Sequence, residues 1–266
     1  MRSNASYLVW YYLAASSGGV SDDLRLMRKI AANCAGLLTI LAMACAFSFA
    51  ADAPDRRTPQ NHEAWTLDSV LRQMDAAAKN FHSLAADIER TKVTVVVNDR
   101  SAETGTIRVR GDKMLLQITA PDSRTILRTG DNLYVYNPGL KRVEEFNLGK
   151  NRAMIEQFLL LGFGTAGHDL QKSYAIKLAG ESTIDDRKTV ELELTPKSDA
   201  VRKHISKFEI WLDLSSCLPL QQEFVETGSG DYSIVKYTHV EKNPNISDSE
   251  FKPHWPKGTE KVKPQM

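Results

Sequence analysis

The stretch GTIRVRGDKMLLQITAPDSRTILRTGDNLYVYNPGLKRV, residues 105–143, decides the fold of this chain. Within it, TIRVR at 106–110, MLLQI at 114–118 and LYVY at 133–136 place apolar side chains at every second position. A period of two is typical of strands that bury one face. The turn sequences TGDN and NPG separate these strands at close intervals, so the stretch predicts an antiparallel meander.

The same pattern continues on both sides of this stretch. VTVVV at 93–97 places Val93, Val95 and Val97 on one face, and NDRSAETG after it is a predicted turn. Further strands are predicted at 125–127, 142–146, 174–182, 188–194, 205–213, 220–227 and 232–240. Strands that follow one another without helices exclude a doubly wound parallel sheet. About ten antiparallel strands from one chain should curl into a barrel-like or half-barrel surface.

Two segments have the helical period instead. Residues 63–78 repeat apolar side chains from Trp65 to Ala78 at helical spacing, and residues 152–161 do so from Met154 to Leu161. The predicted class is therefore α+β, mostly β, with a curved antiparallel sheet in an open half-barrel and the helices as a lid over its concave apolar face. The enclosed space is either an ordinary filled core, which the sequence alone favours, or a lipid site.

The N-terminal segment has the features of an export signal. Met27-Arg28-Lys29 is a basic start, and the run from Ile30 to Phe49 carries no charge. Small residues before Ala51 match a signal-peptidase site, so residues 27–50 are a predicted signal peptide and the protein is predicted to be periplasmic. The alternative is that the uncharged run stays in place as a membrane anchor.

This interpretation divides the chain into segments. Residues 1–26 would be a non-native extension from an upstream start codon, 51–62 a linker, 63–252 the folded domain and 253–266 an irregular tail rich in Pro and Lys. Two of the three cysteines, Cys34 and Cys45, lie in the predicted leader. The mature chain would then keep only Cys217, so it could form no intramolecular disulfide.

A literal G-x-G-x-x-G occurs at Gly162, Gly164 and Gly167. A dinucleotide site needs a strand before the first glycine and a helix after the last. Here the preceding residues favour helix, and barely two turns separate Gly167 from the next strand pattern. We interpret Gly162 and Gly164 as a helix C-terminus, where a left-handed residue costs least without a Cβ.

No other pattern in the sequence indicates catalysis. The six histidines are scattered, and neither a zinc-binding spacing nor G-x-S-x-G occurs. Cys217 lies in DLSSCLP, a predicted hairpin turn. The net charge of +1 gives no general attraction to nucleic acid. We therefore expect no enzyme activity, no cofactor, no metal site and no nucleic-acid partner.

From Leu67 onward the chain resembles the outer-membrane lipoprotein carrier family, LolA and its relatives. The resemblance rests on LDSVLRQMDAAAKNFHSLAADIERT, on the stretch 105–143, on LTPK before the F-x-I strand, and on FKPHWPKG near the end. It implies a half-barrel lidded by helices whose hydrophobic cavity takes lipoprotein acyl chains. It also implies a periplasmic carrier, which we expect to be a monomer, with an inner-membrane lipoprotein-releasing transporter and an outer-membrane acceptor as partners. Relatives on the same scaffold carry glycolipids or sense envelope stress, and these remain alternatives.

The predicted site follows from the strand alternation and from this resemblance. The cavity-lining candidates are Val95, Ile107, Val109, Met114, Leu116, Ile118, Phe208, Ile210 and Leu212. The lid is predicted at residues 152–161 and the first helix, with Met154, Phe158 and Leu161 as its candidates. The resemblance also maps a lid-holding arginine onto Arg110, with Arg108 as the alternative alignment.

Overall fold

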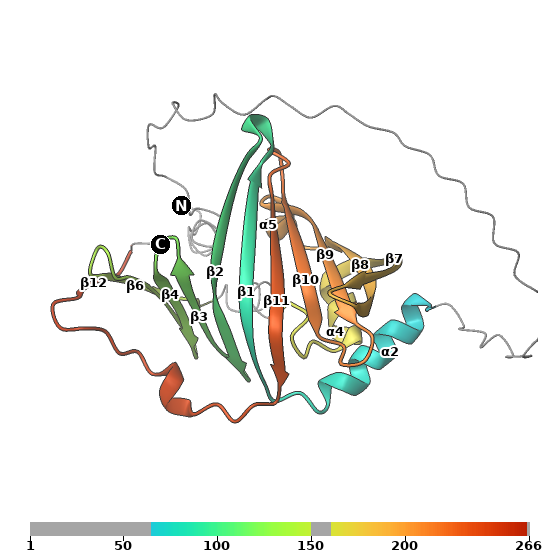
Figure 1. Ribbon diagram of the computed structural model, residues 1–266, viewed down its shortest axis with the longest axis horizontal. Coiled ribbons are helices and arrows are strands. Elements are labelled where there is room, and N and C mark those ends of the chain that lie inside the picture. Colours follow the sequence, from blue (N-terminus) through green and yellow to red (C-terminus); the bar gives the residue numbers. More distant parts are fainter. Residues whose placement is uncertain (1–64, 150–160, 265–266) are drawn as a thin grey trace, which may run out of the picture. The chain divides into compact units, whose positions relative to one another are not determined.

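The computed structural model describes residues 65–149 and 161–264 of the chain. These residues form one open sheet of twelve strands, in the order β12-β6-β5-β4-β3-β2-β1-β11-β10-β9-β8-β7. Figure 1 shows that the sheet curves without closing into a barrel, as the sequence predicted. Every neighbouring pair is antiparallel except β12 and β6, which are parallel.

The elements have the following bounds: α2 Leu67–Ala78, β1 Ser83–Thr94, η1 Val95–Val97, β2 Asp99–Arg110, β3 Lys113–Ala120, β4 Arg124–Thr129, β5 Asn132–Asn137, β6 Arg142–Asn147, α4 Gly167–Ser173, β7 Tyr174–Ile184, β8 Arg187–Pro196, α5 Asp199–Arg202, β9 Ile205–Asp213, β10 Pro219–Glu226, β11 Tyr232–Lys242, η3 Asp248–Phe251 and β12 Glu260–Val262. The predicted leader, and residues 152–160 of the helix predicted at 152–161, lie outside the described residues. In the part of the chain that the structure describes, no helix has the length and apolarity needed to cross a membrane.

Helix α2 begins where the sequence supplies a cap. The Thr66 side chain accepts a hydrogen bond from the Ser69 backbone, and the Ser69 hydroxyl accepts one from the Thr66 backbone. This reciprocal arrangement satisfies two N–H groups that the first helical turn leaves without partners. It places the start of the helix at Leu67, four residues after the start predicted from periodicity.

The first hairpin turns earlier than predicted. Val95–Val97 form the 3-10 turn η1 rather than a strand, and Asn98 closes it in the left-handed conformation with φ 49°. The segment that was predicted to be a turn, SAETG, is paired strand in β2. The reason is local, because an asparagine tolerates φ > 0 at far lower cost than a β-branched residue. The two long strands therefore meet three residues before the predicted position.

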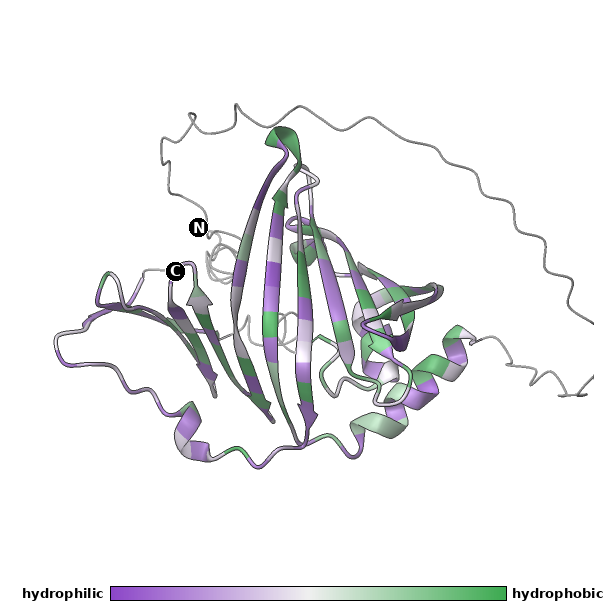
Figure 2. Cartoon of the chain, viewed as in Figure 1, coloured by the Kyte–Doolittle hydropathy of each residue, from purple (hydrophilic) through white to green (hydrophobic). Residues whose placement is uncertain are grey.

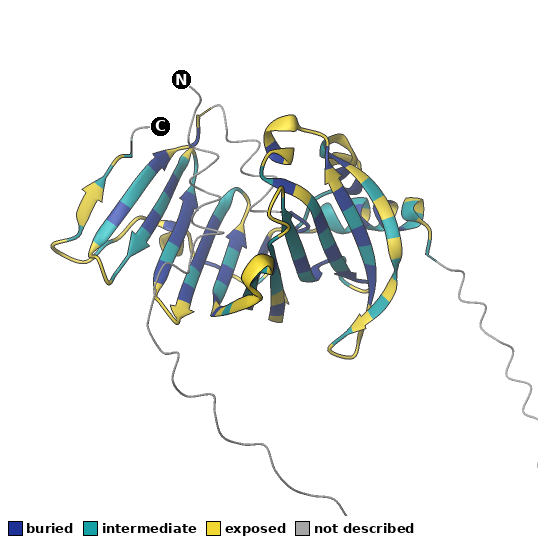
Figure 3. Cartoon of the chain, turned by 90° about the horizontal axis from the view of Figure 1, so that it is seen from above, coloured by how far each residue is buried: buried dark blue, intermediate teal, exposed yellow. Residues whose placement is uncertain are grey.

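Side chains alternate between two faces of the sheet, which we call the inner and outer faces. Figure 2 shows apolar and polar residues alternating along the long central strands, and Figure 3 shows the buried residues in bands across neighbouring strands. The inner face carries two buried apolar clusters. The first cluster includes Leu84, Ile107, Met114 and Tyr237, and the second includes Leu192 and Phe208. Registered pairs from β1 through β11 and β10 to β8 join them into one continuous face.

The two clusters differ in what packs on the sheet. The described members of the first cluster come from strands and loops. The second cluster includes helix residues, namely Val70, Leu71 and Met74 of α2, Leu170 of α4 and Val201 of α5. The α2 helix, which was predicted as part of a lid over the concave face, covers the inner face over β7–β9, where its apolar residues are packed in the second cluster.

The outer face is covered in part by the C-terminal segment. Ile246 and Phe251 pack against Leu115 and Leu127 of β3 and β4, and the Trp255 ring lies with its centroid 5.1 Å from that of Tyr136. Beyond Trp255, β12 adds to the edge of the sheet beside β6, and the other described residues of the tail lie outside helices and strands.

Candidate functional site

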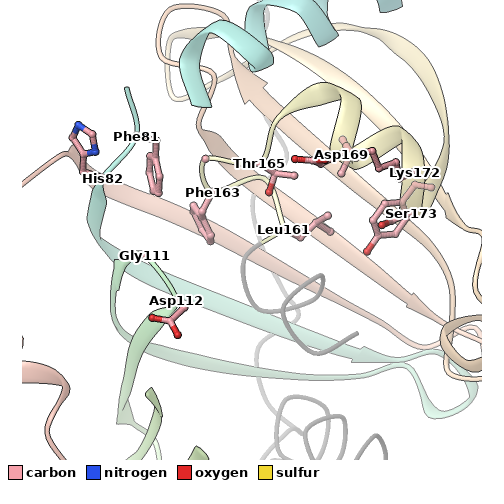
Figure 4. Close-up of a pocket in the computed structure, with 13 residues that line it drawn as sticks. Phe81, His82, Gly111, Asp112, Leu161, Phe163, Thr165, Asp169, Lys172 and Ser173 are labelled. Atoms are coloured by element: carbon pink, nitrogen blue, oxygen red, sulfur yellow. Dashed lines mark hydrogen bonds and ion pairs between the residues drawn. The ribbon is translucent and has the colours of Figure 1, made fainter. Parts of the chain in front are cut away.

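A pocket of about 670 Å³ lies where the two apolar clusters meet. Its apolar lining comes from Phe81 and Phe163, which belong to the first cluster, and from Leu161, Leu170 and Tyr174, which belong to the second. Figure 4 shows Phe81 and Phe163 next to each other on one side, with Asp169, Lys172 and Ser173 of α4 on the other. The volume is that of a small-molecule site, and the lining is mainly apolar with a polar rim.

Two buried polar side chains fix the loop that forms the pocket wall. The Tyr237 hydroxyl donates to Gln222 Oε1 at 2.7 Å, and Gln222 Nε2 donates to the Leu161 carbonyl. Burial raises the pKa of Tyr237, so its phenol stays protonated and remains a donor. Because both side chains point inward from β10 and β11, they anchor the loop after Leu161 to the inner face.

The glycines of the G-x-G-x-x-G sequence serve close packing in this loop. Gly162 and Gly164 have φ of 79° and 66°, the left-handed values predicted for them, and residues 152–160 of the helix predicted before them lie outside the described residues. A Cβ on Gly164 would lie 2.1 Å from the Phe81 ring, and one on Gly167 would lie 2.4 Å from the Leu71 carbonyl oxygen. Glycine is therefore needed where the loop meets Phe81 and where α4 crosses the backbone of α2.

The rim of the pocket joins α2 and α4 through a polar contact. The His168 backbone N–H donates to Asp75 Oδ1 at 3.1 Å, and His168 Nδ1 lies 2.8 Å from the same oxygen. These hydrogen bonds lower the pKa of Asp75 below its ordinary value. The neighbouring Asp169 pairs with Lys172 at 2.7 Å, and this contact lowers the pKa of Asp169.

We expect Asp75→Asn to weaken the α2–α4 contact in a pH-dependent way. Because the folded pKa of Asp75 is depressed, its stabilisation is present above the unfolded pKa near 3.8 and is lost as the pH falls through the folded value. The pair is partly exposed, so the loss at pH 7 should be under about 1 kcal/mol. Urea denaturation at several pH values would measure it, and the difference from wild type should shrink in acid. The control Asp185→Asn, in an exposed turn, should be neutral throughout, and a constant difference for Asp75→Asn would contradict the expectation.

The predicted cavity residues fall into three groups in the structure. Ile107, Val109, Met114, Leu116 and Ile118 are buried members of the first cluster. Phe208, Ile210 and Leu212 are buried in the second cluster, where α2 packs over the sheet. Val95 lies apart from both, 48% exposed in η1, because the hairpin turns at this residue.

Only some of the predicted lid residues lie within the described part of the chain. Leu161 is buried in the second cluster and lines the pocket, whereas Met154 and Phe158 lie outside the described residues. Arg110 lies on the outer face, where its Nη1 donates to the Ile246 carbonyl at 2.7 Å and lies 3.3 Å from Asp248. The strand alternation that puts Val109 inward explains this position. The described contacts of Arg110 thus hold the C-terminal segment, and Arg108 likewise pairs with Glu250.

Sequence reasoning missed a set of buried charged residues on the inner face. Arg90, Glu103 and Arg124 form a buried ionic cluster, and Arg128 is fully buried further along β4. The alternation along β4 could have revealed the two arginines of this strand, because Arg124 and Arg128 flank the buried Ile126 at intervals of two and therefore share its face. Arginines are mostly found exposed, so composition alone would not place them inward.

Cys217 lies in a turn, as the sequence predicted. Cys217 is half-buried in the turn between β9 and β10 with φ 54°, and burial raises the pKa of its thiol. A thiol with a raised pKa is a poor nucleophile at neutral pH. Across residues 65–149 and 161–264, no three His, Cys, Asp or Glu side chains gather in a way that could hold a metal ion.

Comparisons with known proteins agree with the fold. A family model described only as an uncharacterized protein matches residues 110–254, and no curated protein matches the chain. Similar solved structures include an uncharacterized conserved protein from Thermus thermophilus, with 9% identity, 75% of this chain and 100% of that chain covered, and a TM-score of 0.50.

Two further solved structures are similar to this chain. A LolA superfamily protein from Nitrosomonas europaea has 19% identity, covers 71% of this chain and 99% of its own, and has a TM-score of 0.38. The Mycobacterium tuberculosis lipoprotein LppX has 14% identity, 68% and 97% coverage and a TM-score of 0.42. A LolA superfamily protein is thus among the structures that this chain is similar to, and at these identities the likeness concerns the fold.

Proposed function

The chain belongs to this family of uncharacterized proteins, and we propose that it is a periplasmic carrier that binds lipoprotein acyl chains and moves them from the inner to the outer membrane. The observation that carries the proposal is the first apolar cluster with the pocket at its end. Its described members come from strands and loops rather than from α2, and Phe81 and Phe163 join it to the pocket. An acyl chain that replaced water in the pocket would gain about 0.8 kcal/mol for each buried methylene.

The proposal assigns different tasks to the two halves of the inner face. The second cluster, where α2 packs on β7–β9, would serve as the fixed core of the fold. The wall for the acyl chains is the first cluster, with Ile107, Val109, Met114, Leu116 and Ile118 as its lining residues. An inner-membrane transporter would load this wall, and an outer-membrane acceptor with a better apolar site would unload it, because binding without bond breaking leaves release to a competing site.

The test is to express the chain with its leader in a bacterium, purify it from the periplasm without detergent, and analyse it by native mass spectrometry and lipid extraction. Bound lipoprotein or its acyl chains would support the carrier. Free glycolipid would favour a glycolipid carrier on the same scaffold. A protein that carries no lipid and binds no acyl probe would contradict the proposal and favour a protein-binding sensor.

We expect Ser173→Trp to weaken the binding of a fluorescent palmitoyl probe. Ser173 is half-buried on the pocket wall at the end of α4, so a bulky indole there would exclude part of the acyl chain, about two methylenes, from the pocket. At about 0.8 kcal/mol each, that loss corresponds to roughly 10-fold in affinity. Titration of the probe would measure it. The control Thr183→Trp places the same ring at an exposed position of β7 and should bind as wild type does. Equal affinity of all three proteins would exclude the pocket as part of the acyl site.

A further inference from the structure

The tip of the β1–β2 hairpin carries three consecutive exposed valines, which we call the valine tip. Val95, Val96 and Val97 form η1 and are 48%, 84% and 68% exposed. Figure 2 shows this turn as an apolar end on a hairpin whose strands alternate between apolar and polar residues. In the described part of the chain, the other large hydrophobic residue that is exposed is Leu140, which stands alone in the β5–β6 turn. Single exposed apolar residues are ordinary, whereas contiguous ones indicate a contact surface.

The valine tip lies past the last paired residues of the neighbouring strands. Registered pairs between β2 and β3 begin at Thr104, so residues 99–103 of β2 run beyond the end of this pairing. On the other side, β11 follows β1 as far as Tyr232, the partner of Val93. Figure 1 shows the result, with the turn at the far end of the hairpin beside the β10–β11 turn. The three valines are therefore presented end-on rather than on a face of the sheet.

Hydrogen bonds fix the backbone of the valine tip. The Val95 N–H donates to Asp231 Oδ1 at 2.9 Å, and the Asn98 N–H donates to the Val95 carbonyl at 3.2 Å. Asp231 lies in the turn between β10 and β11, so this second turn braces the first. Backbone groups that are paired within the protein enter an apolar environment at far lower cost than unpaired ones. The tip is therefore a preformed apolar point.

We propose that the valine tip inserts into the surface of a lipid bilayer. A stable protein–protein interface takes about 20–30 residues from each side, whereas the exposed residues that follow the three valines, Asn98 and Asp99, are polar. A bilayer requires no such area, because each valine that enters the acyl boundary is removed from water by itself. This inference goes beyond the proposed function, since it assigns the part of the chain that touches a membrane and does not depend on the acyl pocket.

The first test measures flotation of the purified protein with phosphatidylcholine vesicles, with and without added phosphatidylglycerol. We expect wild type to float with both kinds of vesicle and to stay bound in about 0.5 M salt, because salt screens charges but not apolar burial. Val96→Asp should partition roughly 10-fold or more weakly, since it removes one buried valine and adds a charge. Leu140→Asp makes the same kind of change at the single exposed leucine, and it should float as wild type does.

A tryptophan at the tip reports insertion directly. With vesicles present, Val96→Trp should show a blue-shifted emission from the added indole, and brominated phosphatidylcholine should quench it. Leu140→Trp is the control and should show neither change beyond that of wild type. This readout distinguishes the valine tip from any other segment that reaches the bilayer, because the added indole reports only its own position.

The outcomes separate this inference from the carrier. A wild type that does not float, equal flotation of wild type and Val96→Asp, or an unquenched Val96→Trp would each overturn the valine tip as a membrane contact. An oligomer that Val96→Asp dissolves without lipid would mean a contact between copies of the chain, and would overturn it too. Val96→Asp should bind the palmitoyl probe as wild type does, because the tip does not line the pocket. Vesicle binding through the tip by a protein that binds no acyl probe would leave this inference standing while the carrier fails.

Discussion

Replacing Phe208 by alanine is expected to lower the free energy of unfolding by about 3–5 kcal/mol. Phe208 is fully buried on β9, with edge-to-face contacts to Tyr174 at 5.6 Å and Phe224 at 5.5 Å between ring centroids. The truncation would remove its apolar contacts and leave a cavity in the cluster that α2 covers. Urea or guanidinium denaturation of wild type and variant would measure the change.

This experiment also distinguishes a filled core from a lipid-lining wall. If Phe208 lined an empty apolar space, its truncation would cost less, and an added acyl ligand would change the stability of variant and wild type by different amounts. The exposed apolar residue Leu140, which is 70% exposed in the β5–β6 turn, gives the control. Leu140→Ala should change the unfolding free energy by less than about 0.5 kcal/mol. A loss below about 1 kcal/mol for Phe208→Ala would contradict a filled core at this end of the sheet.

The fold was predictable because apolar and polar residues alternate along each short strand of the sheet. In TIRVR and MLLQI, parity alone assigned Ile107, Val109, Met114 and Leu116 to one face, and the structure buries all four. The antiparallel order followed from strands joined by turn sequences. The position of a turn was less predictable. The β-branched run at 95–97 favours a strand by propensity, but the left-handed Asn98 decides where the chain reverses.

The candidate site was predictable only in part, because it depends on contacts between distant segments. Alternation cannot show that α2 fills the second cluster over Phe208, since this requires knowing which strands lie under the helix. The resemblance implied that Arg110 holds a lid. Because Arg110 follows the inward-facing Val109 on β2, its side chain points to the outer face, where it donates to the Ile246 carbonyl. Arg124 on β4 pairs with Glu103 on β2, across the intervening strand β3. No local sequence pattern predicts that these two residues pair.

Glu103→Gln is expected to be as damaging as a core truncation, although it changes no more than a carboxylate to an amide. Glu103 holds both Arg90 and Arg124, and all three groups are buried. Removing its charge would leave two guanidinium groups in a low-dielectric site without the carboxylate that they share, which costs about 3–5 kcal/mol. Chemical denaturation would measure the loss. Glu89→Gln is the control, because Glu89 is exposed on the other face of β1, and its effect should be within about 0.5 kcal/mol.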